Sequence, residues 1–103
     1  MGDLKTILQM TSNSIEKTTA FFYQQNHSDG FLSLEQTLNL LMQSIDAIYA
    51  YKSEGKELGV DTEHLMKTLS EAMGALEEKD TILLSDILIY EVKELYDQVL
   101  ATL

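Results

Sequence analysis

The 103-residue sequence contains no cysteine, proline, arginine or tryptophan. Without cysteine, the chain can form no disulfide framework, thiolate zinc site or thiol nucleophile. The lack of proline suits long helices, because a proline inside a helix costs roughly 3 kcal/mol or more. No apolar run approaches the roughly 20 residues of a membrane span, and no signal peptide opens the chain. We therefore expect a cytoplasmic protein that makes no contact with the membrane.

The missing arginines and the acidic excess argue against a nucleic-acid partner. The sequence has seven lysines and seventeen acidic residues, which gives a formal net charge of −10. Lysine lacks the bidentate fork that recognises phosphate or guanine, and the negative field repels a polyanion. Residues 54–103 hold twelve of the acids and four of the lysines. This acidic half either favours a basic partner or keeps the protein soluble.

Residues 80–103 carry the strongest apolar periodicity. Ile82, Ile87, Ile89 and Tyr96 widen the apolar face of this segment to more than half of the helix circumference. A helix this apolar has to be surrounded by others, so we predict an all-α, four-helix up-and-down bundle with this segment at its centre. The centre of the face is formed by Leu84, Leu88, Val92, Leu95, Val99 and Leu103.

Two long amphipathic helices are predicted in the first half of the chain. They cover about residues 3–25 and 30–53, with a turn at residues 26–30 between them. Residues 11–14, Thr-Ser-Asn-Ser, have poor helix propensity, so a break there or disorder in residues 1–10 is the alternative to a continuous first helix. The predicted core positions are Leu4, Ile7, Leu8, Thr11, Ile15, Thr18 and Phe22 in the first helix, and Phe31, Leu34, Leu38, Leu41, Met42, Ile45, Ile48 and Tyr49 in the second.

Capping residues mark a third helix. Asp61 is its predicted N-cap, Glu63 lies in its first turn, and it ends near Glu78. Asp80 or Thr81 caps the last helix, so the two helices form a tight antiparallel hairpin within a single domain of residues 1–103. The predicted core face of the third helix is Leu65, Met66, Leu69, Ala72, Met73 and Leu76.

No residue pattern points to catalysis, a cofactor or a metal, and we expect no enzyme activity. Asp61-x-x-His64 is one half of the paired carboxylate–histidine motif that bundle metal sites need, and Asp61 already has a capping role. Glu91 falls inside the apolar arc of residues 80–103 and is the carboxylate expected to be desolvated. It is either an acid poised in a cleft or a core-edge residue satisfied by a neighbour.

Some apolar residues are not needed by a minimal bundle. Leu40, Ala47 and Tyr51 lie opposite the main row of the second helix, and Met10 and Phe21 lie to one side of the first. Single exposed apolar residues are ordinary, but a row on one helical face favours an interface. We therefore predict partner binding through these five residues.

The C-terminal half also resembles known proteins. The segments Leu-Met-Lys at residues 65–67, Ala-Leu-Glu-Glu-Lys-Asp at 75–80 and Ser-Asp-Ile-Leu-Ile-Tyr-Glu at 85–91 resemble uncharacterised small acidic helical proteins of Gram-positive bacteria. They are more faintly similar to flagellar export chaperones. The first resemblance implies no known activity. The second implies a groove that holds a hydrophobic helix of a client protein.

These observations predict a non-catalytic helical interaction module, an adaptor or chaperone-like protein, that binds an amphipathic helix of a protein partner. The alternative is a structural homo-oligomer that pairs through Leu40, Ala47 and Tyr51 across a two-fold axis. An enzyme that uses Glu91 is a third hypothesis, and it requires a cleft with a second polar group near Glu91.

Overall fold

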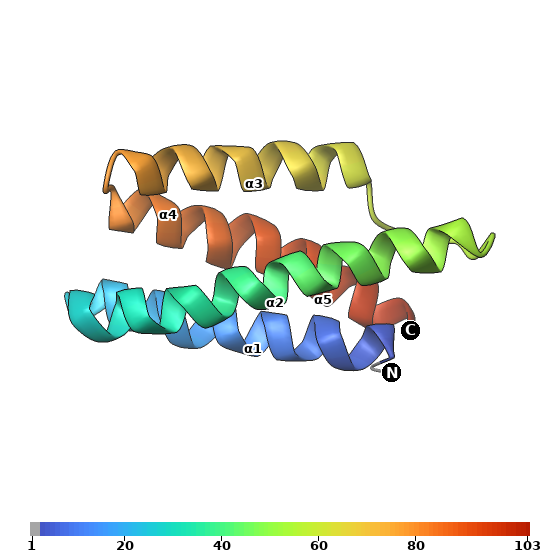
Figure 1. The fold of residues 1–103 in the computed structure, drawn as a ribbon, viewed down its shortest axis with the longest axis horizontal. Helices are drawn as coiled ribbons and strands as arrows, with labels where there is room; N and C mark the ends of the chain where they lie inside the picture. Colours follow the sequence, from blue (N-terminus) through green and yellow to red (C-terminus); the bar gives the residue numbers. More distant parts are fainter. Residues whose placement is uncertain (1–2) are drawn as a thin grey trace.

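The computed structural model describes residues 3–103, and within that range the chain forms four helical rods. The first three are α1 (Leu4–Tyr23), α2 (His27–Ser53) and α3 (Thr62–Glu77). The fourth runs continuously through α4 (Thr81–Ile87), a π-helical turn η1 (Leu88–Val92) and α5 (Lys93–Thr102). Successive rods run in opposite directions along the long axis (Figure 1). The prediction of an all-α up-and-down bundle is confirmed.

Side-chain caps set the ends of the helices. The carboxylate of Asp61 accepts hydrogen bonds from the backbone N–H groups of Glu63 and His64, and Asp80 caps α4 through the N–H of Leu83. Such caps satisfy amides that have no partner inside the helix. The predicted start of α3 is therefore confirmed, as is the tight hairpin between α3 and α4.

One detail at the start of the bundle differs from the prediction. The turn before α2 is shorter than residues 26–30, because Asn26 acts as the N-cap of a helix that already begins at His27. Helix α1 continues without a break through residues 11–14. The prediction of a continuous first helix is therefore confirmed, and its alternative is not: residues 4–10 are helical, and residues 1–2 lie outside the described part of the chain.

The π-helical turn changes which residues of the last rod enter the core. The N–H of Lys93 bonds to the carbonyl of Leu88, five residues earlier. One extra residue in a turn rotates the following helix by about 100° relative to an uninterrupted α-helix. Tyr96 is therefore fully buried in the position expected for Leu95, which is only half-buried. The predicted face is confirmed for Leu84, Leu88, Val92 and Val99, which are buried, Leu95 packs only partly buried against the core, and the prediction is wrong for Leu103, which is exposed.

The π-helical turn also places Glu91 outside the core. Glu91 lies within the π-helical turn and is exposed, so its predicted desolvation is wrong. The neighbouring Tyr90 is 71% exposed. The hypothesis of a catalytic Glu91 in a cleft loses its geometric basis.

Tyr96 is anchored at the centre of the molecule. Its phenol oxygen lies 2.6 Å from the hydroxyl oxygen of Ser44 on α2, and that hydroxyl also donates to the carbonyl of Leu41. Burial raises the pKa of Tyr96 to about 12, against the opposing effect of the hydrogen bond with Ser44. The ring is therefore neutral at pH 7 and introduces no buried charge.

A row of buried hydroxyl groups joins α1 to α2. Thr18 and Thr37 are hydrogen-bonded at 2.8 Å, Ser14 lies 2.6 Å from the Thr37 oxygen, and Ser33 bonds to Thr18. Thr11 donates to the carbonyl of Ile7 in its own helix. Each of these hydroxyls has a partner, so their burial leaves no unsatisfied donor at this interface.

Gly30 allows α2 to approach α1 closely. A Cβ atom at this position would lie 2.7 Å from Cε1 of Phe22, whose ring is fully buried. We expect Gly30→Ala to lower the free energy of unfolding by about 1–3 kcal/mol, because the ring has no free space to move into. The measurement is urea unfolding followed by circular dichroism.

The matched control is Gly74→Ala on α3. A Cβ atom there meets no heavy atom within 4 Å. This change should stabilise the protein by about 0.5–1 kcal/mol, because alanine has the higher helix propensity. Two changes of the same sign would contradict the assignment of a steric role to Gly30.

The bundle is not closed on all sides. Helix α1 packs along α2 and along the last rod, and α3 packs against α4 and η1. Helix α2 packs far less closely against α3 than against α1. Figure 1 shows α3 and α2 on either side of the last rod. The candidate site lies in this gap.

Candidate functional site

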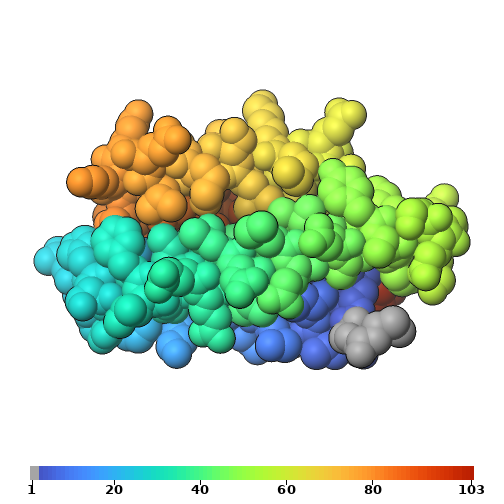
Figure 2. Space-filling view, in the orientation of Figure 1, coloured from blue at the N-terminus to red at the C-terminus, as the bar shows by residue number. Residues whose placement is uncertain are grey.

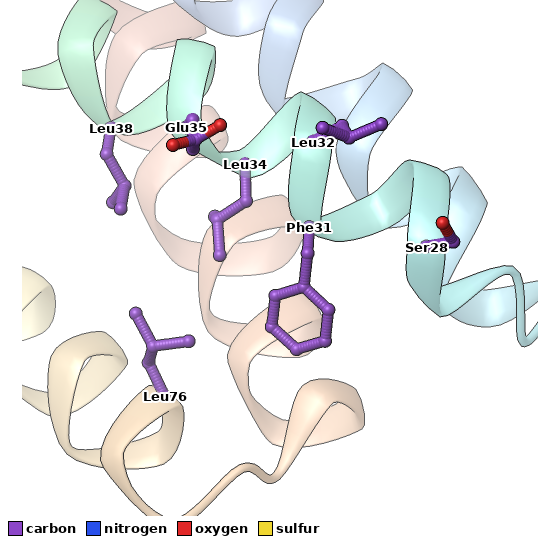
Figure 3. Close-up of a pocket in the computed structure, with 7 residues that line it drawn as sticks. All are labelled: Ser28, Phe31, Leu32, Leu34, Glu35, Leu38 and Leu76. Carbon is purple, nitrogen blue, oxygen red and sulfur yellow. The ribbon is translucent and has the colours of Figure 1, made fainter.

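An open groove of about 580 Å³ lies between α2 and α3. In the space-filling view, a hollow separates α3 from α2, and atoms of the C-terminal rod are visible at its floor (Figure 2). Figure 3 shows Phe31, Leu34 and Leu38 pointing from α2 towards Leu76 of α3. The groove is lined by Ser28, Phe31, Leu32, Leu34, Glu35, Leu38 and Leu76.

The α2 side of the groove is a continuous apolar row, which we call the groove row: Phe31, Leu38, Met42, Ile45 and Tyr49. Their spacing of i, i+7, i+11, i+14 and i+18 places them along one line of an α-helix. Phe31 and Leu38 line the groove, so the rest of the row extends the same face along α2.

All residues of the groove row were predicted to be in the core, and this prediction is wrong for Phe31, Met42 and Tyr49. Met42 is 69% exposed, and Phe31 and Tyr49 are exposed by more than two-fifths. Leu34, Leu41 and Ile48, one step around the helix, are the residues that enter the core. The physical reason is that α2 packs along α1, which leaves the flank towards α3 without a covering helix.

Helix α3 supplies the opposite wall. Counting back from Leu76, Met73, Leu69 and Met66 follow at three, seven and ten residues and share its face. Leu69 is buried, Met73 and Leu76 are half-buried, and Met66 is exposed. The α3 side of the groove is therefore apolar from the buried Leu69 to the exposed Met66.

The row proposed from the sequence as a partner surface points the other way. Leu40 is only 7% exposed, and its backbone carbonyl accepts a hydrogen bond from Thr11 of α1. Ala47 and Tyr51 are half-buried against the core cluster. The expectation that this row is exposed is wrong for Leu40, because the row lies on the side of α2 that faces α1.

Met10 and Phe21 lie on α1, away from the groove between α2 and α3. Met10 is exposed and, with Leu40, lines a shallow depression between α1 and α2. Phe21 is half-buried. The structure therefore brings Met10 close to Leu40 but does not gather the five predicted residues into one surface, and the roles of Met10, Phe21, Ala47 and Tyr51 in partner binding stay predictions.

The polar chemistry of the groove is limited. Ser28 and Glu35 are the lining residues with polar side chains. Across residues 3–103, no group of three His, Cys, Asp or Glu side chains is placed to hold a metal ion. None of the helices in the same range combines the length and apolarity that crossing a membrane would require. What the groove offers a ligand is apolar surface.

Fold and site together define the class of protein: an all-α bundle with an open apolar groove between its second and third helices. The chain belongs to a family described as Domain of unknown function (DUF8042), which matches residues 1–101. No curated protein and no solved structure matches the chain significantly. The family description names no activity, source or partner, so the resemblances to proteins of Gram-positive bacteria and to flagellar export chaperones stay predictions.

Proposed function

We propose that this protein is a non-catalytic interaction module that binds an amphipathic helix of a protein partner in the groove between α2 and α3. The observation that carries the proposal is the groove row: Phe31, Met42 and Tyr49 are exposed on one face of α2, and Phe31 and Leu38 of that face line the groove opposite Leu76 of α3. Apolar side chains exposed together on one face are typical of interaction sites. An apolar helical face laid into such a groove is a common mode of peptide recognition.

The shape of the groove favours a helix over a small ligand. Small-molecule pockets bury most of their ligand and place several polar groups around it. Here Leu32 and Met42 are each about two-thirds exposed, and Glu35 is the one charged residue among the lining residues. A rod lying along α2 would instead cover the groove row from end to end.

Self-association through α2 receives less support. The surface predicted for it includes Leu40, which is buried in the folded chain. Two copies would also bring together chains that each carry a net charge of −10. Like charges placed across an interface oppose its formation.

The test uses a neutral helical peptide as the probe. The peptide has the length of α3, 16 residues, with leucines at i, i+3, i+4 and i+7 spacing and alanine and glutamine elsewhere. We expect its binding, followed by amide chemical shifts of the labelled protein, to perturb α2 and α3. Tyr49→Glu should weaken binding by about tenfold or more, because a charge replaces an apolar contact.

The matched control is Tyr90→Glu. Tyr90 is also an exposed helical tyrosine, but it lies on the C-terminal rod and is not among the groove residues. This variant should bind the peptide like the original protein. The proposal is overturned if the neutral peptide does not bind, or if both substitutions have the same effect.

A further inference from the structure

The apolar groove between α2 and α3 is bordered by carboxylates on both sides. On α2, Glu35 follows Phe31 by four residues and Asp46 follows Met42 by four. On α3, Glu77 follows Met73 by four residues. In a helix these spacings place each acid beside the apolar residue and slightly further out. All three acids are exposed, so they form an acidic rim at the mouth of the groove.

The start of α3 continues this rim with Glu63. It is exposed and precedes Met66 by three residues, which puts it on the same outer edge of the helix. Glu35, Asp46, Glu63 and Glu77 take part in no ion pair within residues 3–103. Their charge is therefore available to a ligand.

The lysines of α2 and α3 do not neutralise this rim. Lys52, at the far end of α2, donates to the carbonyl of Val60 in the following loop. Lys67 follows Glu63 by four residues and lies further around α3 from the groove, and it forms no ion pair with Glu63 within residues 3–103. Across the mouth of the groove, the described chain presents apolar floor and negative edges.

We infer that the groove selects a partner helix that carries lysine or arginine on both sides of its apolar face. A helix lying between α2 and α3 would place its flanking residues against the two edges, as the residues beside a coiled-coil seam do. Positive flanks meet Glu35 and Asp46 on one edge and Glu63 and Glu77 on the other. This inference deepens the proposed function and rests on it.

The charge pattern also argues against a second copy of this chain as the occupant. The apolar faces of α2 and α3 are each bordered by acids, so a second copy would bring like charges to the rim. Complementary potentials speed association and select partners, whereas like charges in contact oppose binding.

The experiment compares three peptides on the intact protein. They share the leucine face and the length of the neutral probe and differ only in their flanks, which carry lysine, glutamine or glutamate. We expect the lysine peptide to bind most tightly and the glutamate peptide least. The preference for lysine over glutamine should shrink as sodium chloride rises from about 0.02 to 0.5 M, because salt screens exposed charges.

Matched charge variants separate the rim from the general acidity of the protein. Glu35→Gln with Glu77→Gln removes two charges from the rim, and Glu91→Gln with Glu94→Gln removes two exposed charges from the C-terminal rod. The rim pair should weaken binding of the lysine peptide about three- to tenfold, in the range expected for two partly exposed ion pairs. The other pair should change it less than about twofold.

The possible results distinguish the inference of a basic partner from the proposed function itself. If the lysine and glutamine peptides bind equally, or if the two charge variants behave alike, the inference of a basic partner is overturned and the proposed function stands. If no peptide binds, the proposed function falls as well. Light scattering of the protein alone completes the test, since a dimer that Tyr49→Glu dissociates would make a second copy the occupant.

Discussion

Replacing Tyr96 with alanine is expected to lower the free energy of unfolding by about 3–5 kcal/mol, the range for large aromatic residues removed from a packed core. The ring is fully buried on the C-terminal rod and is tied to Ser44 of α2 by a 2.6 Å hydrogen bond. Its loss would leave a cavity between α2 and the C-terminal rod. Urea unfolding followed by circular dichroism measures the change.

The control for Tyr96→Ala is Tyr90→Ala, six residues earlier in the same rod. Tyr90 is 71% exposed, so its replacement should change stability by no more than about 0.5 kcal/mol. The comparison tests the rotation introduced by the π-helical turn. If Tyr90→Ala were the more destabilising variant, the rod would not have the register described for η1 and α5.

Leu40→Ala is expected to destabilise the protein by about 2–5 kcal/mol, whereas Met42→Ala should have little effect. The two residues lie on opposite flanks of α2: Leu40 is 7% exposed against α1, and Met42 is 69% exposed on the groove row. Thermal and urea unfolding of both variants provide the measurement.

The same two variants distinguish the two apolar rows of α2 as binding surfaces. A destabilised Leu40→Ala protein with a stable Met42→Ala protein is the result that the structure requires. Weakened binding of the neutral peptide by Met42→Ala, at full stability, would locate recognition on the groove row. The reverse order of stabilities would show that the row of Leu40, Ala47 and Tyr51 is the free one.

The parts of the fold that depend on local sequence could be predicted. The sequence predicts Asp61 as one cap and Asp80 or Thr81 as the other, because a short side chain that accepts a hydrogen bond has a clear function at a helix start, and the structure selects Asp80. The buried face of α1 was also predicted correctly at Leu8, Ile15 and Phe22, because this helix is amphipathic with a regular period. Four alternating rods then follow from short connections.

The C-terminal rod could not be predicted residue by residue. A regular α-helix turns by about 100° per residue, and the π-helical turn at Leu88–Val92 departs from that angle. Within the turn Glu91 faces solvent, and the helix after the turn is rotated, so Tyr96 is buried in the place expected for Leu95. Such turns depend on packing against neighbouring helices, and short sequence windows do not reveal them.

The groove was missed because α2 is apolar on both flanks. From the sequence, the row with Phe31, Met42 and Tyr49 is indistinguishable from a core face. The smaller row with Leu40 looks as if the core of the bundle does not need it. The outcome depends on which flank α1 occupies, which is a tertiary property. One signal was present: α2, with 27 residues, is much longer than α3, with 16, so α3 cannot cover all of it.

The hydroxyl row between α1 and α2 has a consequence for the groove. Two helices that meet only through leucines can slide past each other by one helical turn, because each leucine then packs against the next leucine of the partner helix. The pairs between Thr18, Ser33 and Thr37 do not allow this, since any shift would strand buried hydroxyls without partners. These hydrogen bonds therefore fix both the position of α2 along α1 and its rotation about its own axis. Threonine and serine on the hidden side of α2 thereby determine that Phe31, Met42 and Tyr49, and no other set, are presented to a partner.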